Sequence, residues 1–209
     1  RLYGPPDALV NAAGVLMLGA AEDLSAEDAL MVLDTNFLGA LRITRKALPL
    51  MRARGHGRVV NFSSVNGLLA TPFQAAYTAS KHAMEGYSEA LAMEGRPHGI
   101  QVMLVEPGDH RGGQGKYRQH TAHCTPCYEG ARKRAISRIE RDEAGGADPA
   151  ALGRKVARAM DRKRMPLRLQ VTRFPEKLAI ILHDVLPSNL FVRLLSRYYC
   201  GKIRSTELT

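Results

Sequence analysis

Short apolar runs recur along the chain at the length expected of β-strands, and each is bounded by glycine, proline or polar residues. Between them, apolar or small residues recur at intervals of three and four, which is the period of an α-helix. This period predicts helices over about residues 25–54 and 74–97. The apolar runs predict strands at residues 7–12, 58–62, 101–106 and 168–172.

The second half of the chain is less regular. Residues 109–147 show no clear period, and we expect an irregular segment there. Asp148-Pro149 is typical of a helix N-cap followed by proline at the first helical position, which predicts a helix to about Met160. Residues 175–199 are rich in apolar positions but are interrupted by Pro187. They predict a pair of helices that cover the core; the alternative is a lid or membrane-surface patch for a lipophilic alcohol.

The most informative chemistry lies at the start of the predicted helix 74–97. Tyr77 and Lys81 are four residues apart and share one helix face, and Ser64 follows the strand at residues 58–62. A phenol has an ordinary pKa of about 10, and a nearby cation favours its ionised form, which suits proton transfer near neutral pH. Such a pair alone is usually a half-solvated helix face. Its context indicates a site, because active groups of open α/β sheets gather at the carboxyl ends of strands.

This constellation resembles the short-chain dehydrogenase/reductase family, and three further motifs agree with it. Asn11-Ala12-Ala13-Gly14 is similar to the family's Asn-x-Ala-Gly motif, and Asp34-Thr35-Asn36 is similar to the segment that carries its catalytic asparagine. Val105-Glu106-Pro107-Gly108 is similar to the Pro-Gly turn that flanks the nicotinamide. The resemblance implies an α/β fold, a Rossmann-like doubly wound parallel sheet with helices on both faces. It also implies that residues 109–147 are a substrate-loop insertion.

Carried over residue by residue, the resemblance implies an oxidoreductase that interconverts a carbonyl and a secondary alcohol by using NAD or NADP. Tyr77 is the expected general acid/base, and Lys81 is expected to lower its pKa and to bind the nicotinamide ribose. Ser64 is expected to hold the reacting oxygen, and Asn36 to seat a water that links Lys81 to solvent. Ser63 competes for the serine role, but strand alternation places it on the other face. The expected cofactor-binding residues are Asn11, Ala12, Ala13, Gly14, Tyr77, Lys81, Pro107 and Gly108.

The resemblance also predicts partners. The expected substrate is a small carbonyl or alcohol compound, and lipophilic substrates occur among relatives of this kind. A homo-oligomer is expected for the full-length form. Residues 175–199 would be a C-terminal helical cover over the substrate.

One family feature has no counterpart in the sequence. The glycine-rich phosphate loop that should follow the first strand is missing, and the chain reaches the Asn11 motif almost at once. We therefore expect an incomplete copy that lacks the N-terminal strands of the sheet, so that the activity of this chain alone is in doubt. The alternative function is that of a truncated, non-catalytic relative that acts as an interaction module. NAD and NADP are not distinguished, because the discriminating charge follows the second strand.

Composition excludes other classes of protein. The 209 residues, 45% of them hydrophobic, fit a single domain over residues 1–209. The net charge of +10 invites a nucleic-acid role, but the arginine-rich region 132–173 also carries acidic residues and no recognised binding motif. We therefore expect no nucleic-acid partner. No signal peptide or membrane-spanning run is evident, which leaves a cytoplasmic location as the expectation.

A Cys-x-x-Cys sequence raises the question of a metal or redox site. Cys124 and Cys127 follow His120 and His123, so four potential ligands crowd into eight residues. Structural zinc usually takes two separated ligand pairs, and a redox pair needs a strand-to-helix junction. We expect no metal site here, and Cys200 is most simply a packing residue.

Overall fold

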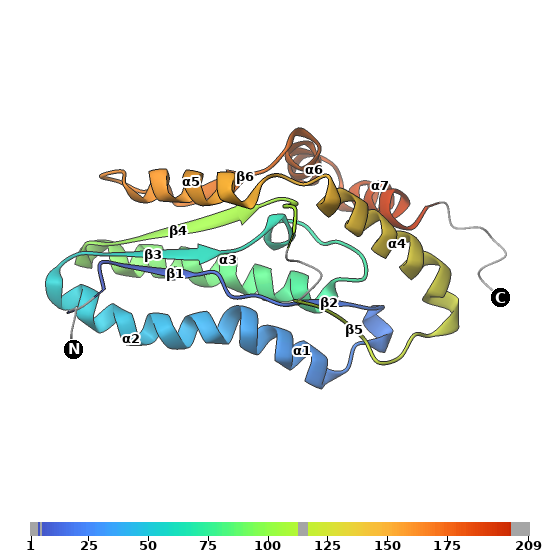
Figure 1. The fold of residues 1–209 in the computed structure, drawn as a ribbon, viewed down its shortest axis with the longest axis horizontal. Coiled ribbons are helices and arrows are strands. Elements are labelled where there is room, and N and C mark those ends of the chain that lie inside the picture. The colour runs from blue at the N-terminus through green and yellow to red at the C-terminus, as the bar shows by residue number, and fades with distance from the viewer. Residues whose placement is uncertain (1–3, 5, 113–116, 202–209) are drawn as a thin grey trace.

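The computed structural model describes residues 4, 6–112 and 117–201 of the 209-residue chain. Its centre is a four-stranded parallel sheet in the order β1-β3-β4-β6, with helices above and below it (Figure 1). The strands are β1 (Ala8–Asn11), β3 (Gly57–Phe62), β4 (Ile100–Pro107) and β6 (Arg168–Val171). The four strands predicted from the sequence are thereby confirmed.

Helices that connect the parallel strands cover both faces of the sheet, so its central strands are buried on both sides. In β3, Val59 packs on one face and Val60 on the other, and both are completely buried. The Val59 face is covered by α2 (Gly39–Arg54) and α3 (Ala75–Gly95), and the Val60 face by α5 (Pro149–Met160). The predicted Rossmann-like sheet with helices on both faces is confirmed.

The two helical regions predicted in the first half of the chain are also confirmed. The region 25–54 forms α1 (Ala26–Leu33), a π-helical segment at Asp34–Leu38, and α2. Ser25 caps α1 by accepting a hydrogen bond from the Asp28 amide at 3.0 Å. Helix α2 ends at Gly55, whose φ of 70° lies in the left-handed region that favours glycine. Short 3-10 turns occur at Ala21–Asp23, Val65–Gly67 and Arg96–His98.

The expectation of an irregular segment over residues 109–147 is wrong. Its described part contains the strand β5 (Arg118–His120) and the 19-residue helix α4 (Pro126–Ala144). Strand β5 pairs in parallel with β2 (Leu16–Leu18), which the sequence did not predict either. Helix α4 is polar, and among its described residues only Ala135 and Ile139 are buried, so a hydrophobic period is hard to see. The ion pair between the Arg138 and Asp142 side chains, at 3.1 Å, links adjacent turns of this helix and stabilises it.

The C-terminal part forms the predicted helix and helix pair. Helix α5 is capped by Asp148, whose carboxylate accepts a hydrogen bond from the Ala150 amide at 3.0 Å. The pair consists of α6 (Phe174–Val185) and α7 (Ser188–Cys200). Ile180 and Phe191 hold this pair against the core through Leu69. Among the described residues, no helix combines the length and apolar character needed to cross a membrane.

Candidate active site

A cavity of ≈ 770 Å³ opens at the carboxyl ends of β3 and β4. In parallel α/β folds, this edge of the sheet is the usual place for a ligand. Strand β3 runs into Ser64, β4 ends in the Pro107-Gly108 turn, and α3 brings Tyr77 and Lys81 to the same cavity. These five predicted site residues, although distant in sequence, are therefore brought together.

Lys81 is buried and lines the cavity together with Tyr77. Its Nζ donates a hydrogen bond to the Phe62 carbonyl oxygen at 2.9 Å and lies 5.5 Å from the centre of the Tyr77 ring. Burial lowers the pKa of Lys81 to about 8, and the negative charge of Glu85 opposes this change. The Lys81 ammonium group therefore loses its proton closer to neutral pH than an ordinary lysine does.

The Tyr77 phenol differs from the expectation in its acidity. Burial raises its pKa, a hydrogen bond with Ser64 lowers it, and the charges of Glu143 and Asp109 raise it further. Burial therefore outweighs the effects that favour the phenolate in this structure. The expected lowering of the phenol pKa by Lys81 is not seen among the described residues. The neutral phenol is the form that can donate a proton to a carbonyl oxygen.

The two neighbouring serines have different surroundings. The Ser64 hydroxyl caps the turn that follows β3 by accepting a hydrogen bond from the Asn66 amide at 3.2 Å, and it also interacts with Tyr77. Ser63 is buried against Gly67, and a Cβ added to Gly67 would lie 2.3 Å from the Ser63 hydroxyl oxygen. Both serines border the cavity, but the interaction with the phenol favours Ser64 for the predicted role.

Asn36 lies behind Lys81, in the π-helical segment between α1 and α2. Its Oδ1 accepts a hydrogen bond from the Val15 amide at 2.7 Å, and its Nδ2 donates to the Val15 carbonyl and to the Ser80 hydroxyl. A Cβ on Gly14 would lie 3.5 Å from Asn36 Oδ1 and 3.8 Å from Lys81 Nζ. Asn36 therefore joins the start of β2 to α3, next to Lys81. π-Helical turns are frequent at functional sites because they alter the direction of a side chain.

The Asn11-Ala12-Ala13-Gly14 motif is divided between the core and the cavity. Ala12 and Gly14 line the cavity, whereas Asn11 and Ala13 are not among its lining residues. The Asn11 amide donates to Thr44 Oγ1 at 3.0 Å and to Asn61 Oδ1 at 2.8 Å, which ties β1 to α2 and β3. The Asn11 side chain is thus placed to support the sheet. Its expected contribution to cofactor binding stays a prediction.

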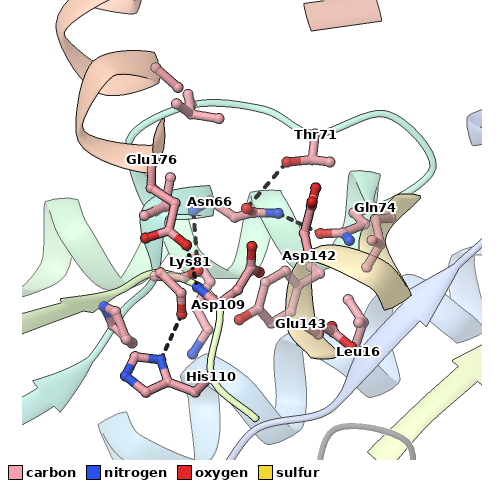
Figure 2. Close-up of a pocket in the computed structure, with 18 of the residues that line it drawn as sticks. Leu16, Asn66, Thr71, Gln74, Lys81, Asp109, His110, Asp142, Glu143 and Glu176 are labelled. Atoms are coloured by element: carbon pink, nitrogen blue, oxygen red, sulfur yellow. Dashed lines mark hydrogen bonds between the residues drawn. The ribbon is translucent and has the colours of Figure 1, made fainter. Parts of the chain in front are cut away.

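Sequence reasoning missed the charged residues that surround the cavity. Figure 2 shows Asp109, Asp142, Glu143 and Glu176 around the same space as Lys81. Burial raises the pKa of Asp109 to about 7, and the negative charges of Glu176, Asp142 and Glu143 add to the rise. The Glu176 carboxylate accepts a hydrogen bond from the Asp109 amide at 3.1 Å. Asp109 follows the Pro-Gly turn and could have been proposed from that position, whereas Glu143 belongs to the helix that was not predicted.

Gly108 makes the approach of α6 to this turn possible. A Cβ at Gly108 would lie 2.2 Å from the Glu176 carboxylate, which is closer than non-bonded atoms approach. Glu176 is held there by Arg173, whose Nη2 lies 2.9 Å from its Oε1. The glycine of the Pro-Gly turn therefore has a steric reason to be glycine in this structure.

The cysteine pair lies away from the cavity. Cys124 and Cys127 are both free thiols, and Cys127 is exposed just inside the start of α4. Within the described part of the chain, no group of three or more histidine, cysteine, aspartate or glutamate side chains is arranged to hold a metal ion. The sequence also has a cluster of glycines, Gly112-Gly113-Gln114-Gly115, and most of it lies outside the described residues.

Curated relatives match this chain over different lengths. The chain is 35% identical over 198 residues to 3-ketodihydrosphingosine reductase of Bacteroides thetaiotaomicron, which covers 94% of this chain and 74% of that protein. It is 47% identical over 105 residues to retinol dehydrogenase 8 of Bos taurus, which covers 50% of this chain and 34% of that protein. The second match therefore spans about a third of its relative.

Solved structures and a family model extend the comparison. A short-chain dehydrogenase from Streptomyces avermitilis superposes with a TM-score of 0.78 at 32% identity, covering 93% of this chain and 70% of that chain. A short chain dehydrogenase/reductase from Burkholderia phymatum in complex with NAD superposes with a TM-score of 0.73 at 25% identity, and the match covers 86% of this chain and 66% of that chain. Residues 1–120 match the family model described as short chain dehydrogenase. The chain therefore belongs to the short-chain dehydrogenase/reductase family.

Proposed function

We propose that this protein is an NAD(P)-dependent oxidoreductase that interconverts a carbonyl and a secondary alcohol, with Tyr77 as general acid/base. The observation that carries the proposal is the meeting of Ser64, Tyr77 and Lys81 at one cavity at the carboxyl edge of the sheet. Membership of an oxidoreductase family supports the reaction class. The specific roles of the three side chains rest on their chemistry and placement.

The residues around the cavity fit the nicotinamide end of a dinucleotide. Gly14 carries no side chain, so it leaves space next to Lys81, and Pro107 and Gly108 also line the cavity. Lys81 has an ammonium donor that can hydrogen-bond ribose hydroxyls. When bound there, the nicotinamide would supply or accept the hydride. The solved relative from Burkholderia phymatum, which is in complex with NAD, supports this choice of cofactor.

The protein's own residues would handle the proton. Tyr77, held neutral by burial, would donate its proton to the carbonyl oxygen during reduction and accept it from the alcohol during oxidation. Ser64 would hold that oxygen and stabilise the charge that develops on it. Lys81, with a pKa of about 8, would favour the phenolate once Tyr77 has given up its proton. Asn36 is placed beside Lys81, where we expect it to connect the ammonium group to solvent.

The proposed substrate class is a lipophilic carbonyl or alcohol. Apolar side chains form much of the cavity wall, including Leu69, Leu182 and Leu195. Two relatives are named as a 3-ketodihydrosphingosine reductase and a retinol dehydrogenase, and these names support the same class. We further propose a cytoplasmic location, a homo-oligomeric full-length form and no nucleic-acid partner, as expected from the sequence.

Turnover of reduced dinucleotide tests the proposal. The protein expressed from the gene's full reading frame is incubated with NADH or NADPH and ketones of increasing chain length, and loss of reduced dinucleotide is followed by absorbance. We expect turnover with one dinucleotide and a rate that increases with the apolar length of the ketone. Dinucleotide binding without turnover of any ketone or alcohol would favour the alternative, a non-catalytic interaction module.

A further inference from the structure

Exposed apolar side chains are concentrated on the two C-terminal helices. Among the described residues, fifteen large hydrophobic side chains are exposed, and eight of these lie between residues 174 and 198. They are Phe174, Leu178, Ile181, Val185, Leu190, Val192, Leu194 and Tyr198. Single exposed apolar residues are ordinary, but a concentration of this kind indicates an interaction surface.

On α6 these side chains form one stripe. Phe174, Leu178, Ile181 and Val185 follow one another at intervals of four, three and four, so they lie on one face of the helix. Phe174 is 78% exposed and Val185 is 67% exposed. The opposite face packs inward through Ile180. The stripe is therefore the outer face of a helix that is already fixed to the fold.

Helix α7 adds a second exposed face. Leu190 and Leu194 are four residues apart and exposed, while Phe191 between them is buried. The Phe191 ring makes an edge-to-face contact with His183 of α6, with 5.1 Å between ring centres. The two helices thus pack together, and each presents an exposed apolar face.

The charges on the same helices have one predominant sign. Lys177, Arg193 and Arg197 are exposed, and of the acidic residues of α6 and α7 only Asp184 is exposed. Glu176 is directed inward, where it accepts hydrogen bonds from the Arg173 guanidinium. The exposed surface therefore combines apolar stripes with a net positive charge. This combination is typical of helices that lie in the interface of an anionic bilayer.

The same surface reaches the mouth of the catalytic cavity. Leu178, Leu194 and Tyr198 are each more than 40% exposed, and each also lines the cavity. They therefore form its outer rim. A surface placed on a bilayer through these residues would open the cavity toward the acyl chains.

We propose that α6 and α7 dock on an anionic lipid bilayer, so that a lipophilic substrate passes between the membrane and the cavity without crossing water. The substrate part of this proposal rests on the proposed function; the docking part does not. Partial insertion of Phe174, Ile181 and Val185 supplies apolar burial, and Arg193 and Arg197 supply attraction to anionic headgroups. No spanning helix is needed for this mode of attachment.

Sedimentation with lipid vesicles tests the docking on the 209-residue chain itself, without cofactor or substrate. One set of vesicles contains phosphatidylcholine alone and the other contains phosphatidylcholine with phosphatidylserine. We expect binding to the anionic vesicles, weakened by salt. The double variant Ile181→Gln/Val185→Gln should bind about tenfold less tightly or worse, because two apolar side chains no longer insert.

Two further variants test whether the vesicle binding depends on the apolar side chains of α6 and on the arginines of α7. Leu30→Gln/Met93→Gln changes side chains that are 61% and 72% exposed on α1 and α3, and it should bind like the wild type. Arg193→Gln/Arg197→Gln should lose the preference for anionic lipid. Circular dichroism checks that each variant is folded.

Three outcomes would overturn the proposal. The first is that the wild type does not bind anionic vesicles. The second is that Leu30→Gln/Met93→Gln loses as much vesicle binding as Ile181→Gln/Val185→Gln. The third is that the chain forms a dimer without lipid and that only Ile181→Gln/Val185→Gln dissociates it. The last result, measured by light scattering, would make the surface an interface between two copies of the chain. Because no turnover is involved, a failure here is distinguishable from a failure of the proposed oxidoreductase activity.

Discussion

Replacing Glu85 with glutamine should lower the pKa of Lys81 further. Tyr77, Lys81 and Glu85 follow one another at intervals of four along α3, so they share one helix face. The Glu85 side chain is 9% exposed, and its charge opposes the effect of burial, which lowers the pKa of Lys81 to about 8. Glutamine keeps the shape of the side chain and removes the charge.

The size of the change in the Lys81 pKa depends on the distance between Lys81 and Glu85 and on Arg168, the other partner of Glu85. Side chains four residues apart on a helix are separated by ~6 Å. At this distance and an effective dielectric constant of ~20, two unit charges interact with an energy of about 3 kcal/mol, which corresponds to a pKa change of ~2. Arg168 Nη1 lies 2.6 Å from Glu85 Oε2 and neutralises part of this charge. We therefore expect the pKa of Lys81 to fall from about 8 by ~1 to 2 in Glu85→Gln.

The assay is an NMR titration of the lysine side-chain carbons, with the Lys81 signal identified by its loss in Lys81→Arg. Glu89→Gln is the matched control, because Glu89 also binds Arg168, at 2.5 Å, but lies one turn farther from Lys81. The control should leave the Lys81 titration close to that of the wild type. An unchanged Lys81 pKa in Glu85→Gln, or an equal fall in both variants, would refute the electrostatic reasoning.

Three other perturbations have expected outcomes. Because burial and neighbouring carboxylates raise the pKa of Asp109 to about 7 in the folded protein, its contribution to stability is fully present below ~4, the ordinary pKa of aspartate, and is lost as the pH rises from ~4 to ~7. Asp109→Asn should flatten that part of a urea-unfolding profile, and an unchanged slope would contradict it. Gly108→Ala should destabilise the protein by about 1–3 kcal/mol in the same assay, since its Cβ would displace the Glu176 carboxylate from its hydrogen bonds, and a neutral result would show that the Glu176 side chain turns aside at little cost. Met103→Ala should lower the free energy of unfolding by about 2–5 kcal/mol, because Met103 is completely buried. Met93→Ala should change it little, because the Met93 side chain is 72% exposed. Equal losses in the two variants would contradict this difference in packing.

The regular parts of the fold could be predicted because their patterns are local. The run Val102 to Val105 marks a strand buried on both faces, and Asp148-Pro149 marks a helix start by its hydrogen-bonding and backbone preferences. Tyr77 and Lys81 could be placed together from helix geometry alone. Their proximity to Ser64 and Gly108 followed from the rule that strand ends meet at one edge of the sheet.

The parts that were missed depend on contacts between distant residues. Helix α4 is stabilised by its tertiary surroundings, since Arg118 of β5 pairs with Glu140 at 3.0 Å and also with Glu143. No local pattern reveals such a contact. The hydrogen bonds that hold the Asn11 side chain in the core could not be predicted either, because its partners lie 33 and 50 residues away in the sequence. The direction of the Tyr77 pKa depends likewise on burial, which spacing along a helix does not determine.

Turnover of a Tyr77→Phe variant, measured beside its dinucleotide affinity, tests most directly the claim that the phenol transfers the proton. Both are measured in the protein from the full reading frame, with Tyr87→Phe, a half-buried tyrosine on the same helix α3, as the control. We expect Tyr77→Phe to lose turnover while it binds dinucleotide as tightly as the wild type, and Tyr87→Phe to retain both. Retained turnover in Tyr77→Phe would contradict the role of the phenol as the proton donor.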